Sequence, residues 1–188
     1  MNKNDKRYIA TEKIIKENYI KLSKSKPGNM ISVAELCKLS NINRSSFYLH
    51  YCDVNELYQT LEKESFEFIE SSFQHYTFDG KIDIIIDMLF NNFQDNTMLL
   101  DFLLNVSKVS KQALIDSSKA IAIKEWQKHS SFTDDDASIA YDFIVGGMTA
   151  ILNAWLNNNF HHPDKYKEMF IKLATEGLHH YVYKDLSQ

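Results

Sequence analysis

The stretch Asn43–Tyr51, which reads NRSSFYLHY, carries the side chains best suited to bind another molecule. Arg44 can donate two hydrogen bonds to the O6 and N7 acceptors of guanine, or it can clamp a phosphate. Ser45 and Ser46 are short hydroxyl donors, which allow a helix to approach its target closely. Because the first turn of a DNA-reading helix enters the major groove, this turn predicts a contact with DNA. The alternative is an Arg44 that is simply exposed and hydrated.

The rest of the stretch divides into outward and inward residues. Tyr48 and His50 can donate hydrogen bonds to phosphates, which position a helix without reading its sequence. Phe47 is expected to point inward and to hold the helix to its own domain. The residues that we expect to contact DNA are Ser32, Asn43, Arg44, Ser45, Ser46, Tyr48, His50 and Tyr51.

The residues just before this stretch have the spacing of a helix-turn-helix. Ser32 is followed three residues later by Glu35, a capping box in which each side chain satisfies a backbone N–H of the first turn. Asn41 tolerates the left-handed conformation that reverses the chain after a helix. Ile42 can fill the corner between the two helices, and Asn43 is a candidate N-cap for the second one. The pattern predicts two short helices joined by a tight turn.

The charge distribution also favours a polyanionic partner at one end of the chain. Residues 1–53 hold ten Lys and Arg against five Asp and Glu, whereas residues 54–188 hold eleven against twenty. The whole chain has a net charge of −4. A basic head on an acidic body suits a protein whose one end meets DNA, although such an asymmetry can also arise by chance.

Composition and periodicity predict an all-α chain of about nine helices. The 188 residues include only 5 Gly and 2 Pro, too few for the many tight turns of a sheet protein. The expected helices cover residues 5–23, 32–40, 44–51, 55–75, 81–93, 97–105, 111–128, 133–158 and 163–184. We expect the change of character after residue 53 to mark a domain boundary.

Residues 9–61 resemble the TetR family of bacterial regulators. The resemblance rests on Ile15 and Leu22, ISVAEL at residues 31–36, NRSSFYLHY at 43–51, and Glu56 with Leu57. Asn41 stands where the family has Gly, and Asp53 is the acidic helix cap that the family keeps. Val54 stands where the family usually has a Lys that contacts the DNA backbone, so this phosphate contact is not expected here.

The resemblance implies a helix-turn-helix DNA-binding domain over residues 1–53 and a helical effector-binding and dimerisation domain over residues 54–188. It also implies a homodimer that places the third helix of each subunit in successive major grooves of a double-stranded DNA operator. The implied function is a transcriptional regulator, a repressor released by a small-molecule effector. The alternative is a helix-turn-helix scaffold that binds a protein partner without specific DNA binding.

The run FIVGGMTAIL at residues 143–152 supports a dimer independently. A helix that is apolar on more than one face must be covered on more than one face. A Gly inside a helix costs about 1 kcal/mol relative to Ala, so a packing reason is expected. The residues expected at the dimer interface are Gly146, Gly147, Ala150 and Trp155, and burial inside one chain is the alternative. Residues 155–163 also resemble the C-terminal domain of a low-GC Gram-positive branch of the family.

The remaining features give weaker or negative indications. Several aromatic residues could line an effector pocket or simply form the core: Phe66, Phe73, His75, Tyr76, Phe90, Phe93, Phe102, Trp126 and Tyr141. His161-His162 and His179-His180 are adjacent, whereas zinc ligands on a helix are usually three or four residues apart, so no metal or cofactor is expected. Without a catalytic constellation, a signal sequence or a long apolar span, we expect a cytoplasmic chain that is neither an enzyme nor membrane-bound.

Overall fold

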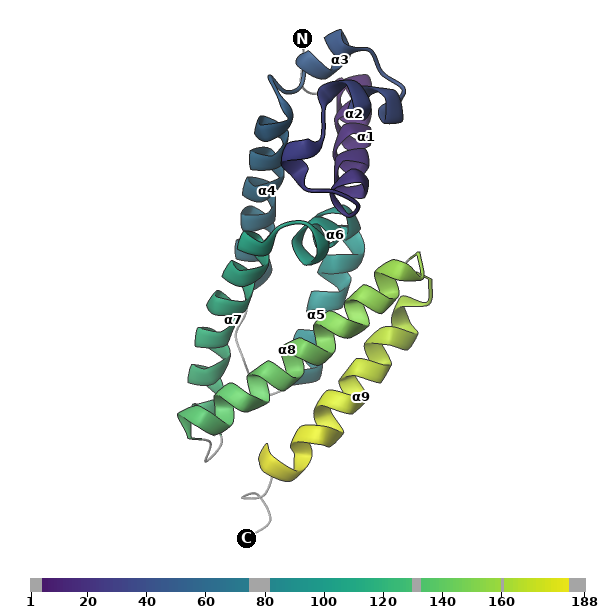
Figure 1. Ribbon diagram of the computed structural model, residues 1–188. Coiled ribbons are helices and arrows are strands. Elements are labelled where there is room, and N and C mark those ends of the chain that lie inside the picture. The colour runs from purple at the N-terminus through teal and green to yellow at the C-terminus, as the bar shows by residue number, and fades with distance from the viewer. Residues whose placement is uncertain (1–4, 75–81, 130–132, 160, 183–188) are drawn as a thin grey trace. The chain divides into compact units, whose positions relative to one another are not determined.

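The computed structural model describes residues 5–74, 82–129, 133–159 and 161–182, and within these ranges the chain is helical and has no strands. Nine α-helices and one short 3-10 helix lie there, which confirms the all-α prediction (Figure 1). The elements are α1 (Lys6–Ser23), η1 (Gly28–Met30), α2 (Val33–Ser40), α3 (Arg44–Tyr48), α4 (Val54–Gln74), α5 (Ile82–Asp95), α6 (Thr97–Asn105), α7 (Lys108–His129), α8 (Asp134–Asn157) and α9 (Pro163–Val182).

The chain forms two compact units, and each unit is made of two separate segments of the sequence. Unit 1 consists of Met1–Phe68 and Met98–Ser110, and unit 2 consists of Ile69–Thr97 and Lys111–Gln188. The first part of α4 and nearly all of α6 therefore belong with α1 to α3. A functional division after residue 53 remains a prediction.

The core of unit 1 explains why α4 and α6 join the N-terminal helices. Ile15 of α1, Leu36 of α2, Phe47 of α3, Leu61 of α4 and Phe102 of α6 belong to one cluster and are completely buried. Each of these side chains is withdrawn from water by residues distant in the sequence, and burying such a side chain contributes about 1.5–3 kcal/mol. The cluster therefore fixes α2 and α3 on a rigid base formed by α1 and α4.

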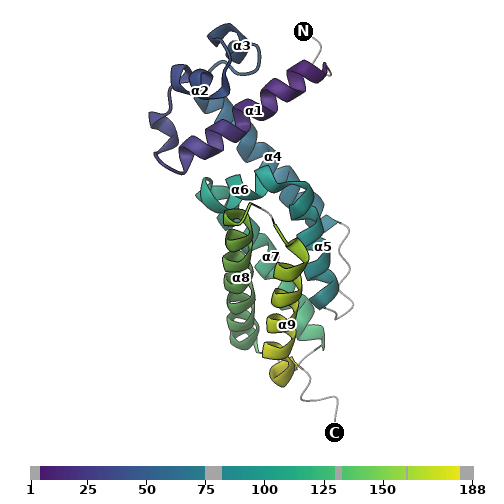
Figure 2. The ribbon, with the colours of Figure 1, turned by 90° about the vertical axis from the view of Figure 1, so that its right-hand side faces the viewer.

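Unit 2 is built around α5, α8 and α9. α9 packs against both α5 and α8, and Figure 2 shows α8 and α9 side by side. The ring of Phe90 lies 6.1 Å from that of Trp155 and 6.5 Å from that of Phe170, measured between centroids. One aromatic residue from each of the three helices thus meets in the core of this unit.

Candidate nucleic-acid interface

The N-terminus of α2 is capped as the sequence predicted, but only on one side. The Oγ of Ser32 accepts a hydrogen bond of 3.2 Å from the backbone N–H of Glu35. The carboxylate of Glu35 pairs instead with the ammonium group of Lys26, which precedes η1. A full capping box forms at α8, where Thr133 and Asp136 satisfy each other's backbone N–H groups. This second box was not predicted, although Thr followed three residues later by Asp is its signal in the sequence.

The turn between α2 and α3 has the predicted left-handed residue. Asn41 has φ 53° and ψ 44°, and the backbone N–H of Ile42 donates to the carbonyl of Cys37 at 3.0 Å. Ile42 is half-buried and packs against the core of unit 1. The reversal at Asn41 and the anchoring of Ile42 together set the direction in which α3 leaves the turn.

α3 begins as predicted and ends earlier than predicted. The Oδ1 of Asn43 accepts from the backbone N–H of Ser46 at 2.7 Å, so Asn43 is the N-cap. The helix contains five residues, Arg44–Tyr48, and does not reach Tyr51. Phe47 is completely buried, which confirms that it holds α3 to its own unit.

Most of the residues expected to contact DNA are exposed, at the start of α2 and on α3. Ser32, Asn43, Arg44, Ser45 and Tyr48 are exposed, with 55% of Tyr48 accessible to solvent, and Ser46 is half-buried. Within the described ranges no carboxylate forms an ion pair with Arg44. Its guanidinium group can therefore donate to a base or a phosphate without first breaking an internal salt bridge.

Two of the expected residues are less accessible, since Tyr51 is buried and His50 is half-buried. Tyr51 is only 3% exposed, and its hydroxyl donates to the carboxylate of Glu12 at 3.1 Å. The imidazole of His50 stacks on Tyr8 at 3.9 Å between centroids, and burial lowers its pKa below the ordinary value while Glu12 opposes that shift. The expectation that Tyr51 contacts DNA does not fit this placement, because its ring is in the core and its hydroxyl is occupied. His50 favours the neutral form and is a weaker phosphate partner than an exposed imidazolium.

A charge network centred on Lys16 was not predicted from the sequence. Lys16 is only 7% exposed. Its ammonium group lies 3.3 Å from the carboxylate of Glu12 and 2.5 Å from that of Glu64 on α4. Because Tyr51 also donates to Glu12, the network joins α1, the residues after α3, and α4. Glu12 lies four residues before Lys16 and was a visible signal, whereas Glu64 is 48 residues away.

Replacing Tyr51 with Phe tests the inward placement of this residue. We expect Tyr51→Phe to lower the free energy of unfolding by about 1 kcal/mol, because Glu12 loses a partly buried hydrogen bond. The affinity for DNA should not change, because the hydroxyl of Tyr51 is bound to Glu12. A urea titration measures the free energy of unfolding. A DNA-binding titration measures the affinity, and a clearly weaker affinity of the folded variant would restore Tyr51 to the DNA surface.

Val54 opens α4 at the position where the family usually has Lys. It is half-buried and packs against the core of unit 1. The side chain thus serves the interior of the unit, and the adjacent Asp53 caps α4 by accepting from the backbone N–H of Glu56 at 2.8 Å.

α8 has two opposite apolar faces. One face is buried in unit 2 and includes Ala137, Tyr141, Ile144, Ile151, Leu152 and Trp155. The other face carries Ile139, Phe143, Gly146 and Ala150 at spacings of four, three and four residues, and all four are exposed. Ile139 is 70% and Phe143 62% accessible. An uncovered apolar stripe of this kind is typical of a surface that binds another molecule.

The four residues expected at a dimer interface do not all lie on the same face of α8. Gly146 and Ala150 are on the exposed face, and a Cβ added at Gly146 would meet no atom within 4 Å. A Cβ at Gly147 would lie 3.5 Å from Phe170, so this glycine faces α9 of its own chain. Trp155 is completely buried inside unit 2. The expectation for Trp155 does not fit this placement, because a residue buried in its own chain offers no surface to a partner.

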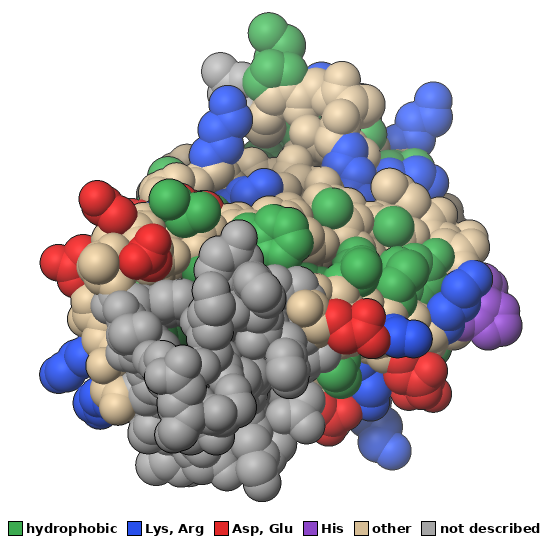
Figure 3. All heavy atoms as spheres, turned by 90° about the horizontal axis from the view of Figure 1, so that it is seen from below, with side chains coloured by type: hydrophobic (Ala, Val, Ile, Leu, Met, Phe, Trp, Pro, Cys, Tyr) green, Lys and Arg blue, Asp and Glu red, His purple; other side chains and the backbone are tan. Residues whose placement is uncertain are grey.

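The exposed apolar stripe of α8 must be compared with the expectation that the chain does not bind a membrane. Among the described residues, α8 is the one helix long and apolar enough to cross a bilayer by these two criteria. In the view from below, hydrophobic side chains form a row next to acidic and basic ones (Figure 3). On α9, Met169 and Leu173 are also exposed and lie four residues apart. Both helices therefore have apolar surface left to cover.

Of the nine aromatic residues considered for an effector pocket, the structure describes the side chains of six, and four of these are buried. Phe90, Phe93, Phe102 and Tyr141 are buried, whereas Phe66 is 39% exposed. Trp126 is half-buried. His75 and Tyr76 lie outside the described residues, as does the side chain of Phe73.

Comparisons with solved structures agree with this architecture. No protein-family model and no curated protein sequence matches the chain. A TetR-like transcriptional regulator from Rhodococcus is 16% identical, with a TM-score of 0.60 over 90% of this chain and 96% of that one. A fatty acid degradation regulator from Bacillus halodurans is 12% identical, with a TM-score of 0.59 over 89% and 96%. A transcriptional regulator from Aquifex aeolicus is 18% identical, with a TM-score of 0.54 over 90% and 98%.

These matches run through both units and cover nearly the whole length of the proteins compared. The resemblance at residues 9–61 is confirmed at the level of architecture: the chain has the fold of the TetR-type transcriptional regulators.

Proposed function

We propose that the chain is a DNA-binding transcriptional regulator that reads an operator with α3. The observation that carries this proposal is the exposed first turn of α3, with Arg44 free of internal ion pairs and Ser45 beside it. A capped turn and a buried Phe47 fix this surface on the core of unit 1. The backbone of this turn is therefore preorganised and loses little conformational entropy when it binds a duplex.

The contacts divide by the chemistry of the side chains. Arg44 is the base reader, or the main phosphate clamp if the groove geometry turns it outward. Tyr48 and Ser32 donate to phosphates, and the exposed N-terminus of α2 at Ser32 adds the partial positive charge of a helix start. Asn43 keeps its side-chain oxygen for the cap, so only its amide N–H₂ is available to DNA.

A homodimer would bring two copies of α3 to one operator. The exposed apolar face of α8, together with Met169 and Leu173 of α9, is the surface that we propose for pairing. Gly146 and Ala150 would allow the two copies of α8 to approach closely. A twofold dimer of this kind binds half-sites about one helical turn apart, roughly 34–36 Å. Insertion of α8 into a membrane is the competing use of the same face, and the dimer experiment in the Discussion separates the two.

Regulation would follow the usual pattern of this fold, repression relieved by a small molecule, in the cytoplasm where the DNA is. One protein of this architecture is described as a fatty acid degradation regulator, so the fold serves metabolic control in at least one case. The alternative is a scaffold that uses the same helix-turn-helix to hold a protein partner.

Binding to DNA from upstream of its own gene separates these functions. A regulator forms a specific complex that weakens steeply with salt, because Lys and Arg contacts release counterions from the phosphates. A scaffold gives no such complex. Binding of this fragment no tighter than that of an unrelated fragment at 150 mM salt would favour the scaffold.

Removing the side chain of Arg44 should weaken specific binding more than non-specific binding. We expect Arg44→Ala to cost about 1–3 kcal/mol of specific affinity if the guanidinium group reads a base. The control is Lys63→Ala, which removes the same charge from an exposed position on α4 that carries only an i,i+4 pair. Fluorescence anisotropy on operator and unrelated DNA measures both. An equal loss on every sequence would reassign Arg44 to a phosphate.

A further inference from the structure

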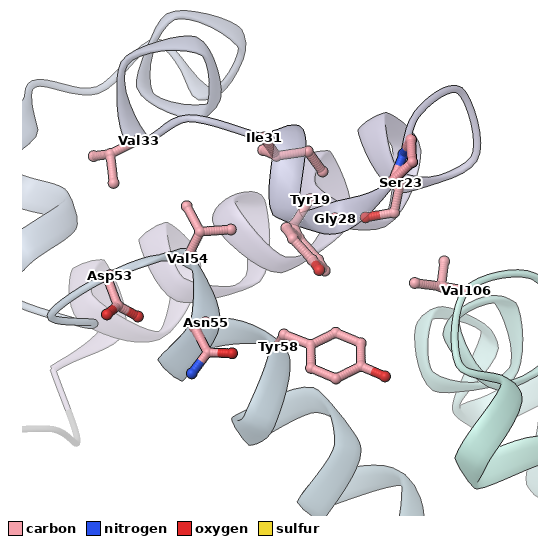
Figure 4. Close-up of a pocket in the computed structure, with 11 residues that line it drawn as sticks. Tyr19, Ser23, Gly28, Ile31, Val33, Asp53, Val54, Asn55, Tyr58 and Val106 are labelled. Atoms are coloured by element: carbon pink, nitrogen blue, oxygen red, sulfur yellow. The ribbon is translucent and has the colours of Figure 1, made fainter.

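Unit 1 contains a cavity next to the helix-turn-helix, lined by none of the α3 residues proposed to contact DNA. It has a volume of about 800 Å³, is open to solvent, and lies between α1, η1, the first turn of α4 and Val106, the residue after α6 (Figure 4). Cavities that hold small molecules usually measure roughly 300–1,000 Å³. The size is therefore that of a ligand site.

The walls of this cavity carry negative and neutral groups only. None of its lining residues is Lys, Arg or His, and the carboxylate among them is Asp53. A second carboxylate, Glu62, lies behind Tyr58 and accepts from the hydroxyls of Tyr58, Ser107 and Ser110. In the part of the chain that the structure describes, Glu62 forms no ion pair. The electrostatic environment therefore favours a cation.

The remaining walls are apolar or aromatic. Val54 and Val106 contribute aliphatic surface, and the nearly buried Tyr19 forms the floor beside Gly28. Tyr58 is half-buried, and Figure 4 shows its ring at the edge of the cavity with the hydroxyl toward Val106. Burial and the hydrogen bond to Glu62 raise the pKa of Tyr58 to about 12, so the phenol stays neutral. The face of a neutral phenol attracts a cation within about 6 Å of its centroid.

We propose that this cavity binds an organic cation with an apolar body. The charged centre would lie near Asp53 and the ring of Tyr58, and the apolar body would cover Val54 and Val106. Asn55, an exposed residue that also lines the cavity, can accept a hydrogen bond from an ammonium N–H through its side-chain oxygen.

The position of this site gives a bound cation a direct effect on α3. Its walls include η1, which leads into α2, and the first turn of α4, which follows α3. A ligand that contacts both η1 and the first turn of α4 can shift the segments that flank the helix-turn-helix on either side. This regulatory consequence rests on the proposed function, whereas binding of the cation does not and can be measured without DNA.

Tetraphenylphosphonium and tetraphenylborate are suitable probes because they have almost the same shape and opposite charge. Isothermal titration of the full chain should give saturable binding of one phosphonium per chain and at least tenfold weaker binding of the borate. Asp53→Asn keeps an N-cap residue but removes the charge, and should weaken phosphonium binding roughly two- to fivefold, the range of exposed charge pairs. Asn55→Lys places a cation in the site and should weaken binding by a similar factor while strengthening that of the borate. Both residues are exposed, so neither change opens the core.

Asp135→Asn is the matched control, because Asp135 is an exposed carboxylate at the start of α8. It should leave phosphonium affinity unchanged. The proposal is overturned if phosphonium does not bind, or if Asp53→Asn and Asn55→Lys bind it as tightly as the parent chain. A chain that binds phosphonium but no DNA would overturn the proposed function and leave this site standing.

Discussion

Phe143→Glu should convert the protein from a dimer into a monomer. Phe143 is 62% exposed in the single chain and lies at the middle of the apolar stripe of α8 with Ile139 and Gly146. In a twofold interface the substitution occurs twice, so two carboxylates would be buried without partners. Central aromatic residues of an interface typically contribute about 2 kcal/mol or more each, and an unpaired buried charge costs further free energy. Sedimentation equilibrium should show the mass of two chains for the parent and of one chain for the variant.

Val109→Glu is the control for this experiment, because Val109 is also 62% exposed but lies on α7. It should leave the mass at two chains. DNA affinity should fall for Phe143→Glu alone, since a monomer engages one half-site. A parent chain that is monomeric, or that sediments with lipid vesicles until Phe143 is replaced, would contradict the dimer and favour the membrane as the partner of α8.

Trp155→Ala should destabilise the fold and leave the pairing surface intact. Trp155 is completely buried and packs against Phe90 in the core of unit 2. Removing a buried Trp leaves a cavity and typically costs about 3–5 kcal/mol, a large part of the 5–15 kcal/mol that stabilises a domain. Urea unfolding at a fixed protein concentration should show a correspondingly lower midpoint.

Trp155→Phe retains an aromatic ring and should cost clearly less than Trp155→Ala. The dimer dissociation constant, measured below the unfolding range, should be the same in both variants and in the parent chain. If Trp155→Ala weakened the dimer and left the unfolding midpoint in place, Trp155 would belong to the interface after all.

Local sequence patterns correctly predicted the features of the structure that depend only on residues close together in the chain. These features are the left-handed conformation of Asn41, the caps at Ser32 and Asn43, and the burial of Phe47. Each depends on residues within about four positions in the sequence. The burial of Tyr51 could also have been predicted from the sequence. It lies four residues after Phe47, and in a helical stretch such residues share a face. We expected it to contact DNA, but its position four residues after the buried Phe47 places it in the core.

The same reasoning applies to Trp155. Successive residues of a helix are about 100° apart, so Ala150 and Trp155 are separated by roughly 140° and cannot face the same partner. The uniformly apolar run concealed this because it has no polar residues to mark the faces. Burial shows the division directly, with Trp155 inside and Ala150 exposed.

Contacts between distant segments could not be predicted from one sequence. Lys16 is buried because Glu64 comes to it from α4, and Phe102 joins the core of unit 1 from α6. The cavity beside Tyr58 likewise exists because Val106 lies opposite α4 (Figure 4). Each of these features depends on how helices pack, which periodicity alone does not determine.

Methylation interference on the bound operator tests most directly whether α3 lies in the major groove. Dimethyl sulfate methylates guanine at N7 in the major groove and adenine at N3 in the minor groove, so one reagent distinguishes the two. We expect N7 methylation to block binding at two clusters about one helical turn apart. If Arg44 reads a base, Arg44→Ala should lose this sensitivity at one guanine of each cluster. A specific complex that tolerates every N7 methyl group and is blocked only at adenine N3 would contradict the placement of α3 in the major groove.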